Sequence, residues 1–235
     1  MTIRERMLNT MVKLRVKLFK FLVGLFSVRI CRIFRHTNLI RTLEEEQLLE
    51  FLNINSSRFV GAYYIDVGAN VGDVARKMAV IFRPVSTILV EPQPHLVEKL
   101  KAKFSDVKVI QAVIGGDHEF EKLYFNQGDD SDVSQTANIY ERRADNAVGI
   151  SVRNLTISDL DIQFEHGGVM KIDIEGAEIN LLTELSKLHC LKNWCILVED
   201  HAHLYKSVQR KIYRKNLKRL ISEIEANGNL VIKWV

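Results

Sequence analysis

The chain has 235 residues, of which 47% are hydrophobic and 26% are charged. This composition excludes an intrinsically disordered chain, and the length is sufficient for one sizeable hydrophobic core. The formal net charge is +4, but residues 1–35 carry +8 and the remainder carries −4. The slightly acidic body argues against a broad surface for the phosphates of a nucleic acid, so we expect no nucleic-acid partner.

The first 35 residues show apolar side chains at spacings of three and four, which predicts an amphipathic helix. Lys13, Lys17, Lys20 and Arg32 lie mostly off its apolar stripe. The densest apolar run, residues 18–30, contains Lys20 and is shorter than the ~20 residues of a membrane span. We predict a basic helical extension over residues 1–37 and one domain over residues 38–235. Residues 1–35 would contact an anionic membrane surface or, alternatively, pack on the domain or on a second copy in a homodimer.

Three cysteines, Cys31, Cys190 and Cys195, are present, and no CxxC pair occurs. An odd number without this spacing indicates neither a disulfide framework nor a zinc site. Reduced thiols favour a cytoplasmic protein, with the inner face of a membrane as the place of any peripheral contact.

Strands and helices are predicted to alternate after a short helix at residues 44–51. The predicted strands are 63–67, 87–90, 107–111, 123–125, 168–173, 195–199 and 230–234. One predicted helix follows the loop after strand 63–67 and ends near residue 82. Three further helices are predicted at residues 94–104, 177–188 and 207–226. Residues 126–137 are predicted to form a polar loop. This order predicts an α/β fold with a mostly parallel central sheet and helices on both faces. In such sheets ligands bind beyond the carboxyl ends of the strands, where the sequence places Asp66, Glu91, Gln111, Asp173 and Glu199.

The loop of residues 66–72 follows the first of these strands and opens a helix. Gly68 permits a sharp turn, and Gly72 permits a close approach of the helix to a ligand. Asn70 replaces the middle glycine of a dinucleotide-binding loop and would crowd a pyrophosphate, whereas Asp66 suits a cationic ligand. The ammonium and sulfonium of S-adenosylmethionine fit this pattern. Glu91, which ends the next strand, can accept hydrogen bonds from both ribose hydroxyls.

Three motifs together resemble the FkbM family of methyltransferases: residues 65–72 (IDVGANVG), 90–94 (VEPQP) and 171–178 (KIDIEGAE). The resemblance covers about residues 63–235. It implies a Rossmann-like methyltransferase fold, S-adenosylmethionine as the cofactor, and a methyl acceptor that is a hydroxyl of a sugar, glycan, lipid-linked saccharide or similar metabolite. The expected cofactor contacts are Asp66, Gly68, Ala69, Asn70, Gly72, Glu91, Pro92, Gln111 and Asp173.

A hydroxyl acceptor must lose its proton during in-line displacement at the methyl group, so a carboxylate or a histidine is expected within hydrogen-bond reach. The candidates at strand ends are Asp173, Glu199 and His201. These three side chains could also bind Mg²⁺ or Mn²⁺, but no ligand spacing demands an ion, and no metal is predicted.

Other functions fit the motifs less well. The alternative is a methyltransferase that acts on nucleic acid or protein, but an enzyme that methylates a base or amide nitrogen commonly carries Asn/Asp-Pro-Pro-Tyr where this chain has Asp173-Ile174-Glu175-Gly176. A nicotinamide oxidoreductase is disfavoured by Asn70 and Asp66, and a non-catalytic membrane-attached scaffold is disfavoured by the intact acidic residues.

Overall fold

The computed structural model describes residues 59, 61–116, 118–126 and 147–234, which all belong to the unit Leu49–Val235. The predicted extension over residues 1–37, its boundary with the domain, the short helix at 44–51 and nearly all of the loop at 126–137 lie outside the described residues. The strands are β1 (Tyr63–Val67), β2 (Ser86–Val90), β3 (Lys108–Ile110), β4 (Val113–Ile114), β5 (Phe120–Asn126), β6 (Ala147–Leu155), β7 (Gly168–Ile172), β8 (Trp194–Glu199) and β9 (Leu230–Trp234). The helices are α3 (Asp73–Phe82), α4 (Pro94–Lys103), α5 (Glu178–Lys187) and α6 (Ser207–Ala226), with single 3₁₀ turns η2 (Ile157–Leu160), η3 (Phe164–His166) and η4 (Ala202–Leu204).

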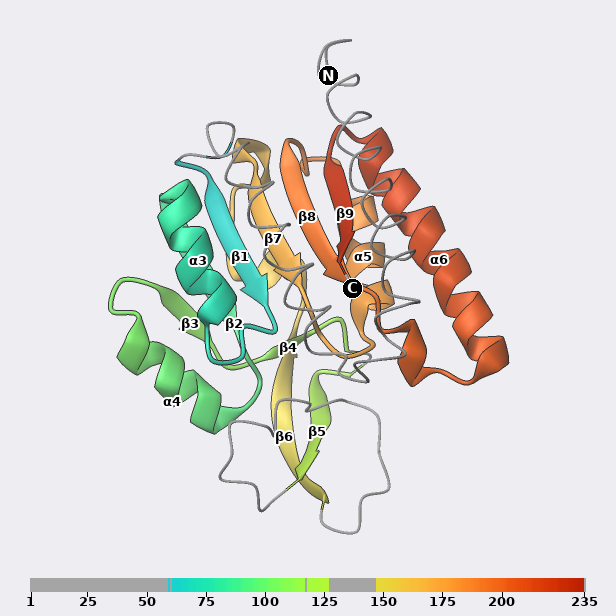
Figure 1. Cartoon of the computed structure of the whole chain (residues 1–235), viewed down its shortest axis with the longest axis horizontal. Coiled ribbons are helices and arrows are strands. Elements are labelled where there is room, and N and C mark those ends of the chain that lie inside the picture. Colours follow the sequence, from blue (N-terminus) through green and yellow to red (C-terminus); the bar gives the residue numbers. More distant parts are fainter. Residues whose placement is uncertain (1–58, 60, 117, 127–146, 235) are drawn as a thin grey trace, which may run out of the picture. The chain divides into compact units, whose positions relative to one another are not determined.

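The central sheet has six strands in the order β3-β2-β1-β7-β8-β9, and every neighbouring pair is parallel. Figure 1 shows α3 in front of β1 and α5 behind β8 and β9. Right-handed crossovers explain this arrangement, because the strand order grows in one direction through α3 and α4 and in the other through α5 and α6. The predicted α/β fold with helices on both faces is confirmed.

The hydrophobic core lies on both faces of the two central strands β7 and β8, in which every residue is buried. The sequences of such strands are nearly continuous apolar runs because neither face of the strand is exposed to solvent. Helix α5 covers one face with Leu181, Leu182 and Leu185, all fully buried. A lysine inside β7, Lys171, is therefore the exception that requires a partner.

A second, smaller sheet has the order β4-β6-β5, with β4 parallel and β5 antiparallel to β6. Sequence analysis predicted part of β5 and neither β4 nor β6. The apolar–polar alternation of Val148, Ile150 and Val152 was an available signal for a half-buried strand. The signal was missed because β6 pairs with β5, and the polar residues 127–146 separate these two strands in the sequence.

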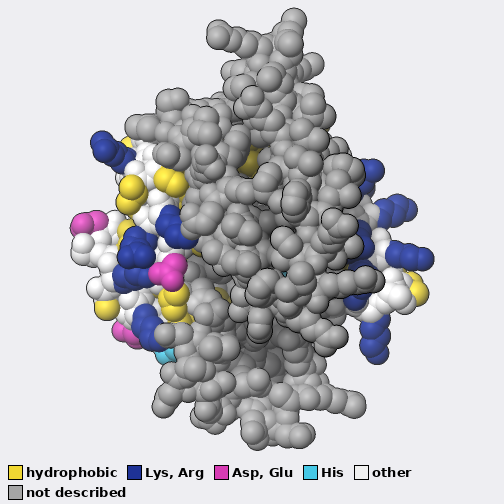
Figure 2. Space-filling view, in the orientation of Figure 1, with side chains coloured by type: hydrophobic (Ala, Val, Ile, Leu, Met, Phe, Trp, Pro, Cys, Tyr) yellow, Lys and Arg dark blue, Asp and Glu magenta, His cyan; other side chains and the backbone are white. Residues whose placement is uncertain are grey.

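Helix α6 presents an exposed basic face, which is visible over α6 at one edge of Figure 2. Its exposed cationic residues are Lys211, Arg214, Lys215, Lys218 and Arg219. The buried face of α6 is formed by Tyr213, Leu217, Leu220 and Ile224, as expected for an amphipathic helix. Among the described helices, none is both long enough and apolar enough to cross a membrane.

The loop after β1 approaches the end of β7 so closely that only glycine fits at its turn. Gly68 has a φ of 84°, and a Cβ built on it would lie 1.8 Å from the carbonyl oxygen of Asp173. Gly228 also has a positive φ, 92°, but a Cβ there would meet no atom within 4 Å. The two glycines therefore share a backbone conformation and differ in what surrounds them.

We predict that Gly228→Ala lowers the free energy of unfolding by about 1–2 kcal/mol, the usual cost of a left-handed alanine. Gly68→Ala should lower it by more than about 4 kcal/mol or prevent folding, because backbone atoms must separate as well. Urea denaturation monitored by circular dichroism measures both values. Equal losses in the two variants would show that the approach of Gly68 to Asp173 does not constrain the fold.

Candidate active site

The site lies where the strand order reverses, between β1 and β7. From β1 the chain adds β2 and β3 on one side, and from β7 it adds β8 and β9 on the other. Ligands of parallel α/β sheets bind at this position, beyond the carboxyl ends of the strands. Val67 and Ile172 are register partners at these ends, and the N–H of Asp173 donates to the carbonyl oxygen of Val67 at 3.0 Å.

Lys171 is the buried cation that joins the two strands. Its Nζ lies 3.0 Å from Oδ1 of Asp66, 2.9 Å from the carbonyl oxygen of Gly68 and 3.3 Å from Oδ2 of Asp173. The hydroxyl of Tyr64 donates to the other Asp66 oxygen at 2.9 Å. Asp66 and Lys171 are 0% and 3% exposed, so each charge depends on the other.

Burial and pairing act in opposite directions on both charges. Burial raises the pKa of Asp66 above its ordinary value, although Lys171 and the Tyr64 hydroxyl oppose this shift. Burial alone would lower the pKa of Lys171, but Asp66 and Asp173 raise it overall, so the ammonium stays charged. Both Asp66 oxygens are engaged within the protein, and its expected direct contact with a cofactor stays a prediction.

Glu91 follows β2 and ties the loop after β1 to the start of α4. Its Oε2 accepts the N–H of Asn70 at 2.9 Å, and its Oε1 accepts the N–H of Gln93 at 3.0 Å. Burial raises the pKa of Glu91 from 4.5 to about 7, although these two N–H bonds oppose the shift. The side-chain oxygens of Asn70 and Gln93 are buried and have no hydrogen-bond partner among the described residues. Two orphaned acceptors beside a carboxylate suit a ligand rich in hydrogen-bond donors.

Four of the five N–H groups in the loop of residues 68–72 are already bonded within the protein. The N–H groups of Gly68 and Ala69 both donate to the carbonyl oxygen of Val90, at 2.9 and 3.0 Å. The N–H of Asn70 is bound by Glu91, and that of Gly72 donates to the carbonyl oxygen of Ala69. A phosphate-binding loop needs free N–H groups that point at the anion. The internal bonding therefore agrees with the argument from Asn70 against a dinucleotide.

The remaining expected cofactor residues occupy different surroundings. Gly72 caps α3 with a φ of 76°, and a Cβ there would meet the side chains of Leu100 and Phe104 at 2.7 and 2.6 Å. The close approach at Gly72 is thus to α4 in this structure. Ala69 is buried and Pro92 is half-buried. Gln111 follows β3, the edge strand of the sheet, and its side chain is exposed.

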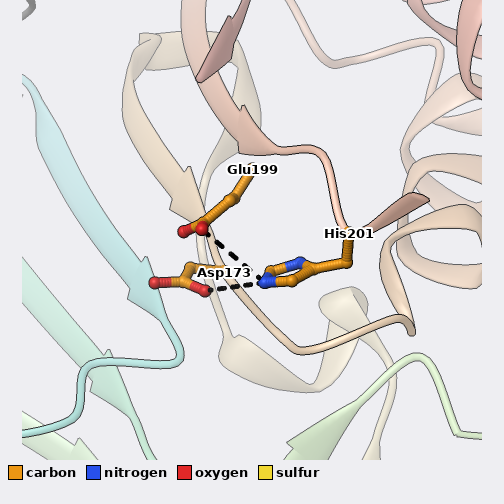
Figure 3. A group of neighbouring side chains, drawn as sticks. All are labelled: Asp173, Glu199 and His201. Carbon is orange, nitrogen blue, oxygen red and sulfur yellow. Dashed lines mark ion pairs between the residues drawn. The ribbon is translucent and has the colours of Figure 1, made fainter. Parts of the chain in front are cut away.

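The three predicted catalytic residues meet at the ends of β7 and β8. Figure 3 shows the His201 ring directed between the carboxylates of Asp173 and Glu199. His201 Nε2 lies 3.7 Å from one oxygen of each, and the three ligand-capable atoms all lie within 4.8 Å of one another. A third carboxylate, that of Glu175, also lies 3.7 Å from Nε2. Sequence analysis brought the first three together correctly but gave Glu175 no site role.

A buried carboxylate orients the histidine. Glu178, the first residue of α5, is fully buried and lies 2.7 Å from His201 Nδ1. Its oxygens also accept the hydroxyl of Tyr213 on α6 and the N–H of Gly176, each at 3.0 Å. Burial lowers the pKa of His201, but the Glu178 hydrogen bond and the charges of Glu178, Asp173 and Glu175 raise it to about 9. The raised pKa favours the protonated form of this imidazole at neutral pH.

Comparisons with known proteins show the family of this chain. The profile of the Methyltransferase FkbM domain family matches residues 66–230. The chain therefore belongs to the FkbM methyltransferase family. No curated protein matches it. A solved FkbM methyltransferase from Methylobacillus flagellatus KT is similar, with 16% identity over 55% of this chain and a TM-score of 0.35. The chain spans 30% of that protein.

The raised pKa of Glu91 predicts how stability depends on pH. Between pH 4.5 and about 7 the folded state holds a proton on Glu91 that the unfolded state has released, so stability falls as the pH rises through this window. The loss reaches about 3 kcal/mol at pH 8. Urea denaturation from pH 5 to 8 should show this fall in the wild type relative to Glu91→Gln. Parallel pH profiles for the two proteins would contradict it.

Proposed function

We propose that the protein is an S-adenosylmethionine-dependent O-methyltransferase. The proposal rests on one observation. The place between β1 and β7 where the strand order reverses has two sides of different chemistry, and Lys171 joins them. On the β1–β2 side are Glu91 and two orphaned buried acceptors. On the β7–β8 side are carboxylates gathered around one oriented histidine. The first half suits a donor-rich cofactor, and the second suits a hydroxyl that must lose a proton.

The residues present fit S-adenosylmethionine. Glu91 is held by one N–H at each oxygen, which leaves acceptor capacity on both oxygens for the two ribose hydroxyls. The orphaned oxygens of Asn70 and Gln93 would accept further donors of the cofactor. The excess of carboxylates around Asp173 favours a ligand that carries ammonium and sulfonium charges. When bound, the cofactor supplies an electrophilic methyl group.

The residues of this chain have three tasks at the acceptor half. Asp173 and Glu199 accept a hydrogen bond from the acceptor hydroxyl and orient its oxygen toward the methyl group. A side chain of the Asp173, Glu199 and His201 group receives the proton as the new bond forms. Glu178 holds the imidazole in one orientation through Nδ1, so that Nε2 faces the reacting groups.

The acceptor class follows from charge. Carboxylates at the acceptor half accept hydrogen bonds from several hydroxyls and repel phosphates, which favours a sugar, glycan or lipid-linked saccharide over a nucleic acid. The alternative of a methyltransferase that acts on nucleic acid would need a cationic surface for phosphates at this place. Asp173, Glu175 and Glu199 provide the opposite.

We expect S-adenosylhomocysteine, but not NAD, to raise the melting temperature. At 100 times its Kd a ligand adds about 2.7 kcal/mol to the free energy of unfolding. Glu91→Gln should weaken binding at least about tenfold at pH 8, because hydrogen bonds to a charged acceptor are lost. The control is Glu98→Gln, which removes a mostly exposed carboxylate on α4 and should leave binding unchanged. Stabilisation by NAD alone would refute the cofactor assignment.

We expect methyl transfer from labelled S-adenosylmethionine to glycan or saccharide-lipid fractions, with the label in an alkali-stable ether. Methyl esters would be released by alkali, and methylated nitrogen would survive as a methylamine after acid hydrolysis, so mass spectrometry of the hydrolysate separates the three products. Glu199→Gln should lower kcat about 10²–10⁴-fold. Label found only in ester or amine would exclude O-methylation.

A further inference from the structure

The donor set around His201 has the composition of a metal site. Asp173 is the first residue after β7, Glu199 is the last residue of β8, and His201 lies two residues further. Each offers one ligand atom, and these atoms converge on one point in Figure 3. Two carboxylate oxygens with one imidazole nitrogen are typical ligands of Mn²⁺ and related divalent ions.

The distances fit an ion better than direct contact. A protonated Nε2 would draw one carboxylate oxygen to within ~2.7–2.9 Å. Three oxygens instead lie 3.7 Å from Nε2, from Asp173, Glu199 and Glu175, which is too far for a hydrogen bond. Two atoms that each bind one ion at ~2.1–2.2 Å lie ~3.0–3.8 Å apart for bond angles from 90° to 120°. The observed separation therefore leaves room for an ion between them.

The histidine is also oriented as a ligand. Its side chain is 3% exposed, and its Nδ1 is fixed by Glu178, so Nε2 is the atom presented to the carboxylates. Histidines that bind metals almost always give their other ring N–H to a carboxylate or carbonyl, which fixes the tautomer. Glu178 has the further bonds from Tyr213 and Gly176 that a rigid supporting group requires.

Carboxylates outnumber cations in the ion pairs near this point that the described residues form. Five carboxylates and two cationic side chains take part in these pairs; the carboxylates are Asp66, Asp173, Glu175, Glu178 and Glu199, and the cations are Lys171 and His201. Buried carboxylates need a compensating charge. A divalent ion would supply it even after the imidazole has lost its proton.

We propose that Asp173, Glu199 and His201 bind one divalent cation, best represented by Mn²⁺. Three protein ligands leave open positions for two oxygens of the acceptor or for water. The ion would hold the acceptor oxygen and favour loss of its proton; this role rests on the proposed O-methyltransferase function, whereas binding of the ion does not.

The test uses the full chain, freed of metal with a chelator and titrated with Mn²⁺ alone. Loss of the free Mn²⁺ electron paramagnetic resonance signal should report one tight site. Glu199→Gln should raise the Kd at least tenfold. Asp200→Asn removes the neighbouring negative charge, which pairs with Lys233 and the N–H of Ala202, and should change the Kd less than twofold. No binding by the wild type, or equal weakening in both variants, overturns the proposal.

A second measurement identifies the nitrogen ligand. Pulsed electron paramagnetic resonance of bound Mn²⁺ should show coupling to a ¹⁴N nucleus, and His201→Asn should abolish that coupling. Bound Mn²⁺ without this coupling in the wild type would place the ion on carboxylates alone and overturn the three-ligand site. S-adenosylhomocysteine binding is measured separately in the metal-free protein, so failure of the cofactor proposal and failure of the metal proposal give different results.

Discussion

The site depends on one buried ion pair, between Lys171 in β7 and Asp66 in β1. The two residues are direct register partners in adjacent parallel strands, so their side chains meet without any loop having to place them. The same ammonium binds the carbonyl oxygen of Gly68 and the carboxylate of Asp173. Removal of one member of such a pair typically costs 3–5 kcal/mol, because an uncompensated charge stays buried. The turn after β1 and the residue after β7 are thus fixed by one cation.

The contacts of Lys171 lie between two groups of residues with different chemistry, at the ends of neighbouring strands. Four of the five N–H groups in the loop of residues 68–72 donate to Val90, Glu91 or the loop itself, so the loop mainly offers a ligand hydrogen-bond acceptors. The ends of β7 and β8 offer carboxylates and an oriented imidazole. Lys171 lies between the halves and compensates charge on both sides. In the function proposed above, a cationic methyl donor and a hydroxyl acceptor would occupy these neighbouring strand ends.

Strand periodicity alone predicted where several candidate site residues lie in the fold. Asp66, Glu91, Asp173 and Glu199 end or follow strands, and parallel strands bring their carboxyl ends to one edge of the sheet. The same rule gave Gln111 as a cofactor contact, which stays a prediction. The structure places Gln111 after the edge strand β3 with an exposed side chain, and periodicity alone does not give strand order. Lys171 was identifiable as a lone cation in an apolar run. Tyr213 was not, because its contact with Glu178 arises only from the packing of α6 on α5.

The turn between β7 and α5 shows why this site tolerates backbone strain. Glu175 has a φ of 51°, a left-handed conformation that costs a non-glycine residue about 1–2 kcal/mol. Within six residues the turn must bring Asp173 toward one ring nitrogen of His201 and Glu178 to the other. A relaxed turn would carry one of these carboxylates away. Because the two contacts act on opposite nitrogens of a single buried ring, the ring and the strained turn fix each other, and the geometry of the acceptor half follows from that mutual constraint.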